Sequence, residues 1–476
     1  MAGHQKRGNR NAFEVHFEKK RPAGGIWVLT SLHGNSTGIP MKELRFNTFG
    51  FSAVVLVLLV FLIGLPCRKV SGQELPFFAD VPTARPVITR LSAVPALGGK
   101  KQFHTIRNFK LGGHYEPGGK ETYESGGQGG VTLESLGYGP LRTAYIAVGT
   151  PKRNQAGKIT NAIVINSYYS GDSTNMYFFW HEGQPGTAFS NGSVVGPGRL
   201  IDTDTYYVIF LDSLGLWGAS KPSDGLGLRF PDYSYADIVQ VSYRLLKDKL
   251  GVEKIRLATG VSMGGSLCYV WALLHPDFVD GILPIAANST PDNVARWIFQ
   301  LMNAGLKSDP VWRQTNGDYY NLPGDQRPVK GLMFGWSILN LTALTFDYRS
   351  GQAWEQVKGD VFYWKPENGC GSNLIERAED FDTNDMIVRN RTCLKYDISD
   401  HLHEIEAKTL VLHAYSDQWL IYEKAKETAG KIPGARIVGF ESPLAHYSCF
   451  RAPHICKKDV TAFFREIGLG PEDKTM

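Results

Sequence analysis

The feature that most constrains the fold of this chain is an alternation of short apolar runs with amphipathic stretches. The runs AIVIN, YYVIFLD and GILPIAA have the length and β-branched content of buried strands. Residues 235–251 follow a helical period, with Ile238, Val241 and Leu245 on one face and Gly251 placed to end the helix. The strand KIRLAT and the helix SLCYVWALLHP come next. This order of strands and helices predicts a mostly parallel sheet with right-handed crossovers.

The alternation stops over residues 289–400 and then resumes. That interval is rich in aromatic residues and predicts mostly helices and loops. The pattern returns with the strand KTLVLHA, the helix YEKAKETAG, the strand ARIVGFES and a last helix around KDVTAFFREIG. The sequence therefore predicts an α/β core, residues 131–288 and 401–476, with a helical cap inserted at 289–400.

An apolar run with no charge, residues 51–65, lies within the segment 41–72. It is too short for a comfortable membrane span and is followed by small residues, as in a secretory signal. We expect export to the periplasm or the medium, with a retained membrane anchor over residues 49–66 as the first alternative and a buried segment as the second. Because a signal normally starts near its methionine, residues 1–40 are interpreted as an extension that is untranslated if synthesis begins at Met41.

The charge of the chain is concentrated at its N-terminus. The formal net charge is +5, and residues 1–45 hold eight Lys or Arg against three Glu. The remainder is close to neutral, which argues against a nucleic-acid-binding surface on the folded part. Residues 73–130 are rich in Pro and Gly and predict an exposed, extended arm.

Cysteine and histidine spacings do not indicate a metal site. None of the six cysteines forms a C-x-x-C pair with another. A disulfide between Cys370 and Cys393 or between Cys449 and Cys456 is one interpretation for an exported protein. Free, buried thiols are an alternative that the sequence supports equally. His401 and His403, in DHLHE, are interpreted as a solvated face. No nucleotide-binding or zinc motif is present, so no cofactor and no metal are expected.

Two serines match the pattern G-x-S-x-G. Ser262 lies in GVSMGG, between a predicted strand and a predicted helix, where glycines permit the sharp turn that exposes a nucleophilic hydroxyl. The backbone N–H of Met263 would then lie at the helix start, where it can bind an oxyanion. Ser36, in GNSTG, precedes Ile39 and Pro40 rather than a helix. We therefore predict Ser262 as the nucleophile.

A serine nucleophile needs a base and a carboxylate to orient that base. In this architecture they follow the serine in the order acid, then histidine. Asp417 comes directly after the strand KTLVLHA, and His446 comes in the loop after the next strand. Both therefore occupy the expected positions. Four other candidates fail on position: His413, His454, Asp382 and Asp385.

The second oxyanion donor should come from the loop after the strand AIVIN. That loop reads SYYSGDS, and Gly171 indicates a tight turn. Tyr169 is the predicted donor through its backbone N–H, with Tyr168 as the alternative.

Several motifs in order resemble the homoserine O-acetyltransferase-like group of α/β-hydrolases. They include GPGRLIDTDTYYVIFLDSLG, GVSMGG, LKSDPVWRQTNGDYY and SPLAHYSCF, and GASKPSDGLGLRFPDYSYADIV is similar to a hydrolase branch of that group. The resemblance spans residues 103–464. It implies an α/β-hydrolase fold with a helical cap, and Ser262, Asp417 and His446 as nucleophile, acid and base. It also implies that Arg349, in DYRS, contacts substrate.

The departures from that family concern substrate binding. Homoserine transferases have an arginine at the position of Asn303, as if to clamp a carboxylate, and an aspartate at that of Tyr447, suited to an amine. Ser167 stands where a histidine is usual. A zwitterion would lose two charge-assisted hydrogen bonds, each worth about 1.5–3 kcal/mol. Homoserine binding is therefore expected to be weak.

The leading hypothesis is a serine hydrolase of carboxylic esters, and by extension amides, with a small acyl ester as its partner. The alternative is an acyltransferase that passes the same acyl group to an alcohol or amine. Export favours hydrolysis, because acetyl-CoA is a cytoplasmic metabolite. A third hypothesis is a binding protein on a hydrolase fold, which a missing triad member would have favoured. Composition gives no oligomeric state, and a dimer remains an option.

Overall fold

The computed structural model describes residues 99–112, 130–174, 176, 194–350 and 380–469, together with three strands between residues 14 and 46; the side chains of Tyr348 and Arg349 are not described. The chain divides into two units, Met1–Leu75 and Pro76–Met476. The predicted signal run at 51–65 and the cap aromatics lie outside the described residues; those aromatics are Trp354, Phe362, Tyr363 and Trp364.

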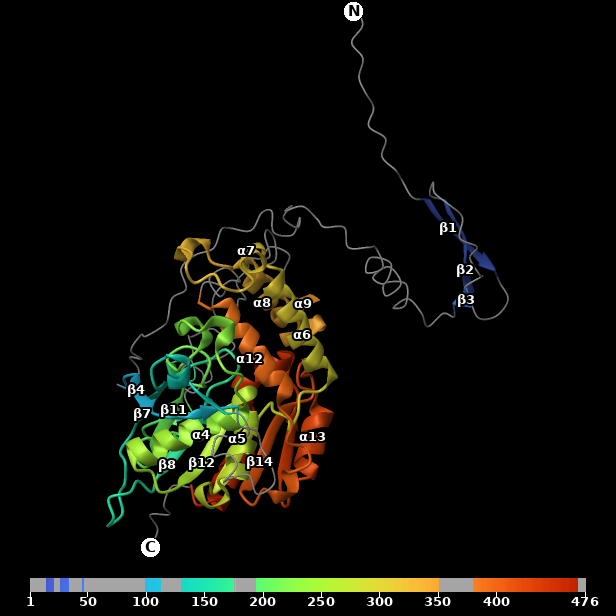
Figure 1. Ribbon diagram of the computed structural model, residues 1–476. Coiled ribbons are helices and arrows are strands. Elements are labelled where there is room, and N and C mark those ends of the chain that lie inside the picture. Colours follow the sequence, from blue (N-terminus) through green and yellow to red (C-terminus); the bar gives the residue numbers. More distant parts are fainter. Residues whose placement is uncertain are drawn as a thin grey trace, which may run out of the picture. The chain divides into compact units, whose positions relative to one another are not determined.

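The first unit contains a small antiparallel sheet. Strands β1 (Glu14–Lys20), β2 (Ile26–His33) and β3 (Arg45–Phe46) pair in that order (Figure 1). Two of them lie inside the segment interpreted as an N-terminal extension. In the part of the chain that the structure describes, no helix has the length and apolar character needed to cross a membrane.

The second unit is built on an eight-stranded sheet with the order β15-β14-β13-β12-β8-β11-β7-β4. Six neighbouring strands of this sheet pair in parallel: β15, β14, β13, β12, β8 and β11. Strand β7 pairs antiparallel with β11, and β4 pairs antiparallel with β7. Their bounds are β4 Gln102–Ile106, β7 Leu141–Val148, β8 Ala162–Asn166, β11 Tyr207–Leu211, β12 Ile255–Val261, β13 Gly281–Ile285, β14 Lys408–Ala414 and β15 Arg436–Phe440.

The structure differs from the sequence-based prediction at the start of this sheet. Residues 73–130 were predicted to form an exposed arm, but β4 pairs with β7 and β5 (Lys110–Leu111) pairs with β6 (Val131–Thr132). Edge strand β4 is mostly exposed, so it lacks the continuous apolar run that marks the inner strands.

Helices cover both faces of the sheet. In β8, Ala162 and Val164 belong to the larger core, whereas Ile163 and Ile165 belong to the smaller one, because side chains alternate along a strand. Helices α4 (Tyr235–Arg244), α5 (Met263–Leu274) and α13 (Tyr422–Gly430) contribute to the larger core, and α15 (Lys457–Glu466) contributes to the smaller one. The described part of the second unit thus folds into three layers, helix on sheet on helix.

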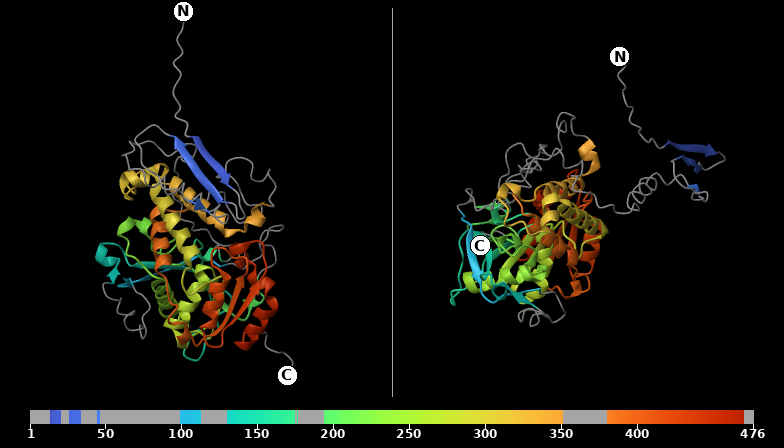
Figure 2. Two further views of the ribbon diagram at one scale, coloured as in Figure 1. Left: turned by 90° about the vertical axis from the view of Figure 1, so that its right-hand side faces the viewer. Right: turned by 45° about the horizontal axis from the view of Figure 1, so that its top comes forward.

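The cap helices gather at one end of the sheet (Figures 1 and 2). Helix α6 is amphipathic and packs against α8 and α12, and its buried residues include Ile298, Phe299 and Met302. The cap helices are α6 (Asn293–Ser308), α7 (Pro310–Thr315), α8 (Lys330–Ala343), α9 (Phe346–Ser350) and α12 (Thr383–Lys395).

The four described cysteines are free and buried: Cys268, Cys393, Cys449 and Cys456. Neither of the two disulfides considered from the sequence is formed by them, and the alternative of buried thiols describes this part of the chain.

Candidate active site

Ser262 lies at a strained turn between β12 and α5. Its φ is 55° and its ψ is −124°, a conformation that a residue with a side chain rarely adopts. The turn also requires glycine beside it. A Cβ on Gly264 would lie 2.5 Å from the carbonyl oxygen of Asn166, and one on Gly260 would lie 2.7 Å from the backbone of Gly264. The local sequence therefore permits the close approach that raises the serine out of the sheet.

The structure brings Ser262, His446 and Asp417 into one hydrogen-bonded chain. The Nε2 atom of His446 lies 2.9 Å from Ser262 Oγ, and its Nδ1 lies 2.8 Å from Asp417 Oδ2. Asp417 follows β14, and its Oδ1 accepts N–H groups from Trp419 and Leu420 at 2.9 Å each. His446 lies in a 3₁₀ helix after β15, and both side chains are buried. The three residues predicted from chain order thus meet at one end of the sheet.

The environment of Asp417 favours its ionised form. Burial acts to raise the pKa of this carboxyl, but the charge of His446 and the hydrogen bond from it outweigh burial and hold the pKa below its usual value. An ionised Asp417 can stabilise a positive imidazole ring on His446.

The rejected candidates occupy structural positions. His413 lies within β14, and its Nε2–H donates to the carbonyl of Leu420 at 2.6 Å. Its Nε2 is also 3.5 Å from Asp417 Oδ2, while burial lowers the pKa of the His413 ring. Asp382 caps α12, and Asp385 accepts the N–H and hydroxyl of Ser223.

The predicted oxyanion donors lie beside the serine. Met263 is the first residue of α5, where backbone N–H groups have no partner within the helix. Tyr169 borders the same cavity as Ser262 and Met263. Tyr168, the alternative donor, packs its ring edge-on against the ring of Phe450. The Tyr168 ring also lies so close to Gly171 that a Cβ on Gly171 would be 2.4 Å from it.

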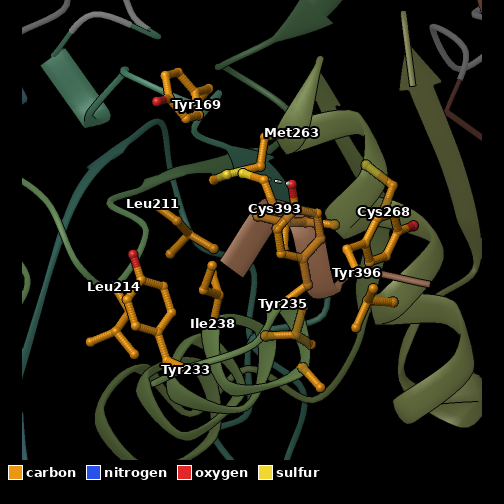
Figure 3. Close-up of a cluster of buried hydrophobic side chains, with 14 of the residues drawn as sticks. Tyr169, Leu211, Leu214, Tyr233, Tyr235, Ile238, Met263, Cys268, Cys393 and Tyr396 are labelled. Atoms are coloured by element: carbon orange, nitrogen blue, oxygen red, sulfur yellow. Dashed lines mark hydrogen bonds between the residues drawn. The ribbon is translucent and has the colours of Figure 1, made fainter. Parts of the chain in front are cut away.

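A cavity of about 30 Å³ opens at Ser262. Among its wall residues, the rings of Tyr235 and Tyr396 stack at 4.3 Å, and Trp419 lies edge-on to His446. Figure 3 shows Met263, Tyr235, Cys393 and Tyr396 gathered in one cluster. Among the described residues, the lining consists of Tyr169, Tyr235, Ser262, Met263, Ser266, Asn288, Thr290, Pro291, Phe299, Cys393, Tyr396, Trp419 and Leu420.

Asn303 and Tyr447, two of the substrate-binding positions inferred from the family, are not among the described residues that line this cavity. Asn303 is half-buried and accepts a hydrogen bond from the amide of Asn390 at 2.9 Å. Tyr447 donates its hydroxyl to Asn340 at 2.9 Å. Both polar groups are therefore engaged with cap side chains rather than directed at a ligand. The side chain of Arg349 lies outside the described part of the structure.

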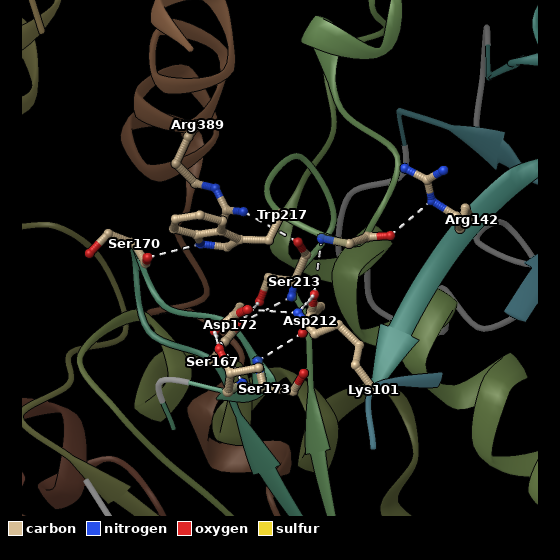
Figure 4. Close-up of polar contacts among 12 residues, drawn as sticks. Lys101, Arg142, Ser167, Ser170, Asp172, Ser173, Asp212, Ser213, Trp217 and Arg389 are labelled. Carbon is tan, nitrogen blue, oxygen red and sulfur yellow. Dashed lines mark hydrogen bonds and ion pairs between the residues drawn. The ribbon is translucent and has the colours of Figure 1, made fainter. Parts of the chain in front are cut away.

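Two cap residues near the site were missed by the sequence reasoning. On α12, Asn390 accepts the hydroxyl of Tyr169. Its neighbour Arg389, labelled in Figure 4, is buried and donates to the carbonyl of Leu214 at 2.8 Å. Arg389 also donates to Met263 Sδ at 3.1 Å. The signal available in the sequence was that Arg389 and Asn390 are polar residues that directly follow a short apolar run in the predicted helical cap.

A buried ion cluster holds the loop that carries Tyr169 (Figure 4). Lys101 Nζ lies 2.6 Å from Asp172 Oδ2 and 2.9 Å from Asp212 Oδ2, and the Lys101 side chain is 2% exposed. Burial acts to lower the pKa of Lys101, but the two carboxylates raise it overall. Burial raises the pKa of Asp212 despite the charge of Lys101. Strands β8 and β11 and the start of β4 are thereby joined beside the site.

Known proteins resemble this chain in sequence and in fold. A family model described as the alpha/beta hydrolase fold matches residues 189–324. The homoserine O-acetyltransferase of Thermobifida fusca is 29% identical over 329 residues, which cover 64% of this chain and 83% of that enzyme. A probable acyltransferase of Methanothermobacter thermautotrophicus is 27% identical over 304 residues, or 63% of this chain and 85% of that protein.

A solved structure shares the fold. The acetylester hydrolase from Corynebacterium glutamicum superposes with a TM-score of 0.60 at 20% identity, covering 77% of this chain and 96% of that one. Together with the sheet order and the serine turn, these likenesses show an enzyme with the α/β-hydrolase fold whose sequence is similar to those of homoserine O-acetyltransferases.

Proposed function

We propose that this protein is a serine-dependent hydrolase of carboxylic esters that works through an acyl-enzyme. The observation that carries the proposal is the hydrogen-bonded chain from Ser262 through His446 to Asp417, opening on a cavity. This is the geometry by which a weak hydroxyl nucleophile is activated.

The residues have distinct roles in the proposed reaction. Ser262 Oγ attacks the ester carbonyl while His446 Nε2 takes its proton, and ionised Asp417 stabilises the imidazolium. The backbone N–H groups of Met263 and Tyr169 bind the oxyanion of the tetrahedral intermediate. His446 then protonates the leaving alcohol. In the second half, His446 takes a proton from water as the water oxygen attacks the acyl-enzyme carbonyl. His446 then gives this proton to Ser262 Oγ as the bond to the acyl group breaks and the acid leaves.

Hydrolysis is favoured over transfer to homoserine by the character of the cavity. Within the described residues, the cavity wall has no charged side chain, and Asn303 and Tyr447 stand where the transferases have ionic groups. A zwitterionic acceptor would lose its solvation without gaining ionic partners. Acyl transfer is the second candidate, because the two relatives named above are described as a probable acyltransferase and a homoserine O-acetyltransferase.

The test compares ester hydrolysis with acyl transfer. The full chain and its Ser262→Ala variant are given p-nitrophenyl esters from acetate to octanoate, with and without acetyl-CoA and homoserine. Ser36→Ala, in the second G-x-S-x-G match, is the matched control. We expect ester hydrolysis that falls at least about 10³-fold in Ser262→Ala and is unchanged in Ser36→Ala. Ser262-dependent formation of acetylhomoserine would instead establish the transferase.

We further infer that residues 41–72 direct export. The support is the uncharged run at 51–65 with basic residues before it. N-terminal sequencing of protein from fractionated cells should find a new terminus near residue 73. An uncleaved chain in the membrane fraction would point to the anchor over residues 49–66.

A further inference from the structure

Asn288 differs from the other polar residues around the cavity. It follows β13, lines the cavity with Ser262, and is 2% exposed. Neither its Nδ2 nor its Oδ1 has a hydrogen-bond partner among the described residues. Its own backbone carbonyl accepts the hydroxyl of Ser266 at 3.0 Å, and the N–H of Ser266 bonds to the carbonyl of Ser262 at 3.0 Å. Asn288 is thus hydrogen-bonded to Ser266, which lies one helical turn from the nucleophile.

Other hydroxyl groups on the same wall are satisfied. The hydroxyl of Tyr235 contacts Cys393 Sγ at 3.4 Å, and that of Thr290 donates to the carbonyl of Tyr396 at 3.4 Å. Trp419 is the second exception, since its Nε1–H also lacks a partner in the described part of the chain. Buried polar groups are nearly always paired, so two unpaired ones in one small cavity indicate a polar ligand.

The chemistry of the cavity narrows the ligand. The Asn288 amide can donate and accept, and Trp419 can only donate. The described wall has no charged side chain to balance a carboxylate or an ammonium, so the complementary group is neutral. A cavity of about 30 Å³ has room for only a few atoms beyond a bound carbonyl, because one water needs roughly 10–15 Å³ by the same measure.

We propose that Asn288 selects esters of short hydroxyacyl groups. In these esters a neutral hydroxyl lies no more than three carbons from the scissile carbonyl. This inference rests on the proposed hydrolase function and names its substrate class. In the complex, the substrate hydroxyl donates to Asn288 Oδ1 and accepts from its Nδ2–H. A site built to pair with a substrate hydroxyl rejects the analogue that lacks it, because its buried polar groups are then left unpaired.

The experiment uses matched ethyl esters and a pH-stat. The pairs are acetate with glycolate, propionate with lactate, and butyrate with 3-hydroxybutyrate. The full chain should prefer the hydroxy ester of at least one pair by roughly 10- to 100-fold in kcat/KM. Asn288→Leu, an apolar replacement of similar size, should bring that ratio close to one. Asn293→Leu, at an exposed asparagine on the first turn of α6, should leave the ratio unchanged.

The outcomes separate the two proposals. Ester hydrolysis that persists in Ser262→Ala would refute the proposed function itself. Hydrolysis that depends on Ser262 but shows no preference for any hydroxy ester would overturn the role of Asn288 alone. A preference that survives in Asn288→Leu would overturn it as well. The preference of the parent is measured without a variant, and Asn288→Ala replaces Asn288→Leu if the latter does not fold.

Discussion

Replacing Lys101 by methionine should destabilise the protein strongly. Each of its two ion pairs, at 2.6 and 2.9 Å, is buried. With an effective dielectric constant of about 20, a unit charge pair at such distances attracts by about 6 kcal/mol. Desolvation offsets much of this attraction, but removing one partner leaves the other charges buried and uncompensated, which costs about 3–5 kcal/mol. We expect a loss of that size in the free energy of unfolding at pH 7.

The loss should depend on pH in a defined direction. Burial already raises the pKa of Asp212, and removing Lys101 takes away the charge that opposes this. A carboxyl whose pKa is raised in the folded state makes its full contribution to the free energy of unfolding below its unfolded pKa of about 3.9. This contribution is lost as the pH rises through the pKa of the folded state. The deficit of Lys101→Met should therefore be smaller at pH 5 than at pH 8.

Urea unfolding followed by circular dichroism at both pH values provides the measurement. Lys100→Met, at the exposed neighbouring residue, is the matched control and should lie within about 1 kcal/mol of the parent. Adding Asp172→Asn and Asp212→Asn to Lys101→Met should recover part of the stability. The reasoning is refuted if Lys101→Met is no less stable than Lys100→Met, or if its deficit grows on acidification.

Three further predictions concern the site and the thiols. Asp417→Asn should lower kcat by about 10³- to 10⁴-fold with little change in KM, because the hydrogen bond to His446 Nδ1 at 2.8 Å sets the orientation of the base; a fall of less than tenfold in ester hydrolysis would contradict this role. Asn390→Leu removes the acceptor for the Tyr169 hydroxyl. The kcat of this variant should be roughly tenfold lower than that of Asn303→Leu, which replaces the hydrogen-bond partner of Asn390 on α6. A change confined to KM in steady-state assays would count against this role of Asn390. Burial raises the pKa of Cys393 and of Cys456 to about 11, so a variant without Cys67 and Cys370 should not react with a disulfide reagent at pH 8 until it is unfolded; rapid labelling of the native variant would show that these thiols are accessible.

The parts of the fold that local sequence specifies were predictable, and those that depend on distant partners were not. Strands β8 and β13 are short apolar runs. A Cβ on Gly260 or Gly264 would lie only 2.5–2.7 Å from backbone atoms, so glycine is required at both positions. Both features leave a local signal in the sequence. Strand β4 leaves none, because it is an exposed edge strand within a Gly-rich segment.

The same distinction holds at the site. Chain order was enough to single out Asp417 and His446, since each follows a predicted strand. The partners of Lys101 are 71 and 111 residues away, and nothing near Lys101 indicates them. The unpaired amide of Asn288 is also invisible in sequence, because the absence of a partner is a property of packing.

The anchoring of α12 has a consequence for how enzymes of this shape can be recombined. Arg389 joins this cap helix to the turn after β11 and to Met263, and Asn390 joins it to Tyr169. A chimera that exchanged residues 289–400 as one block would therefore remove supports of the catalytic turn along with the cap. Cap and core are not interchangeable modules in this chain, and a transplanted cap should restore activity only when both α12 side chains travel with it.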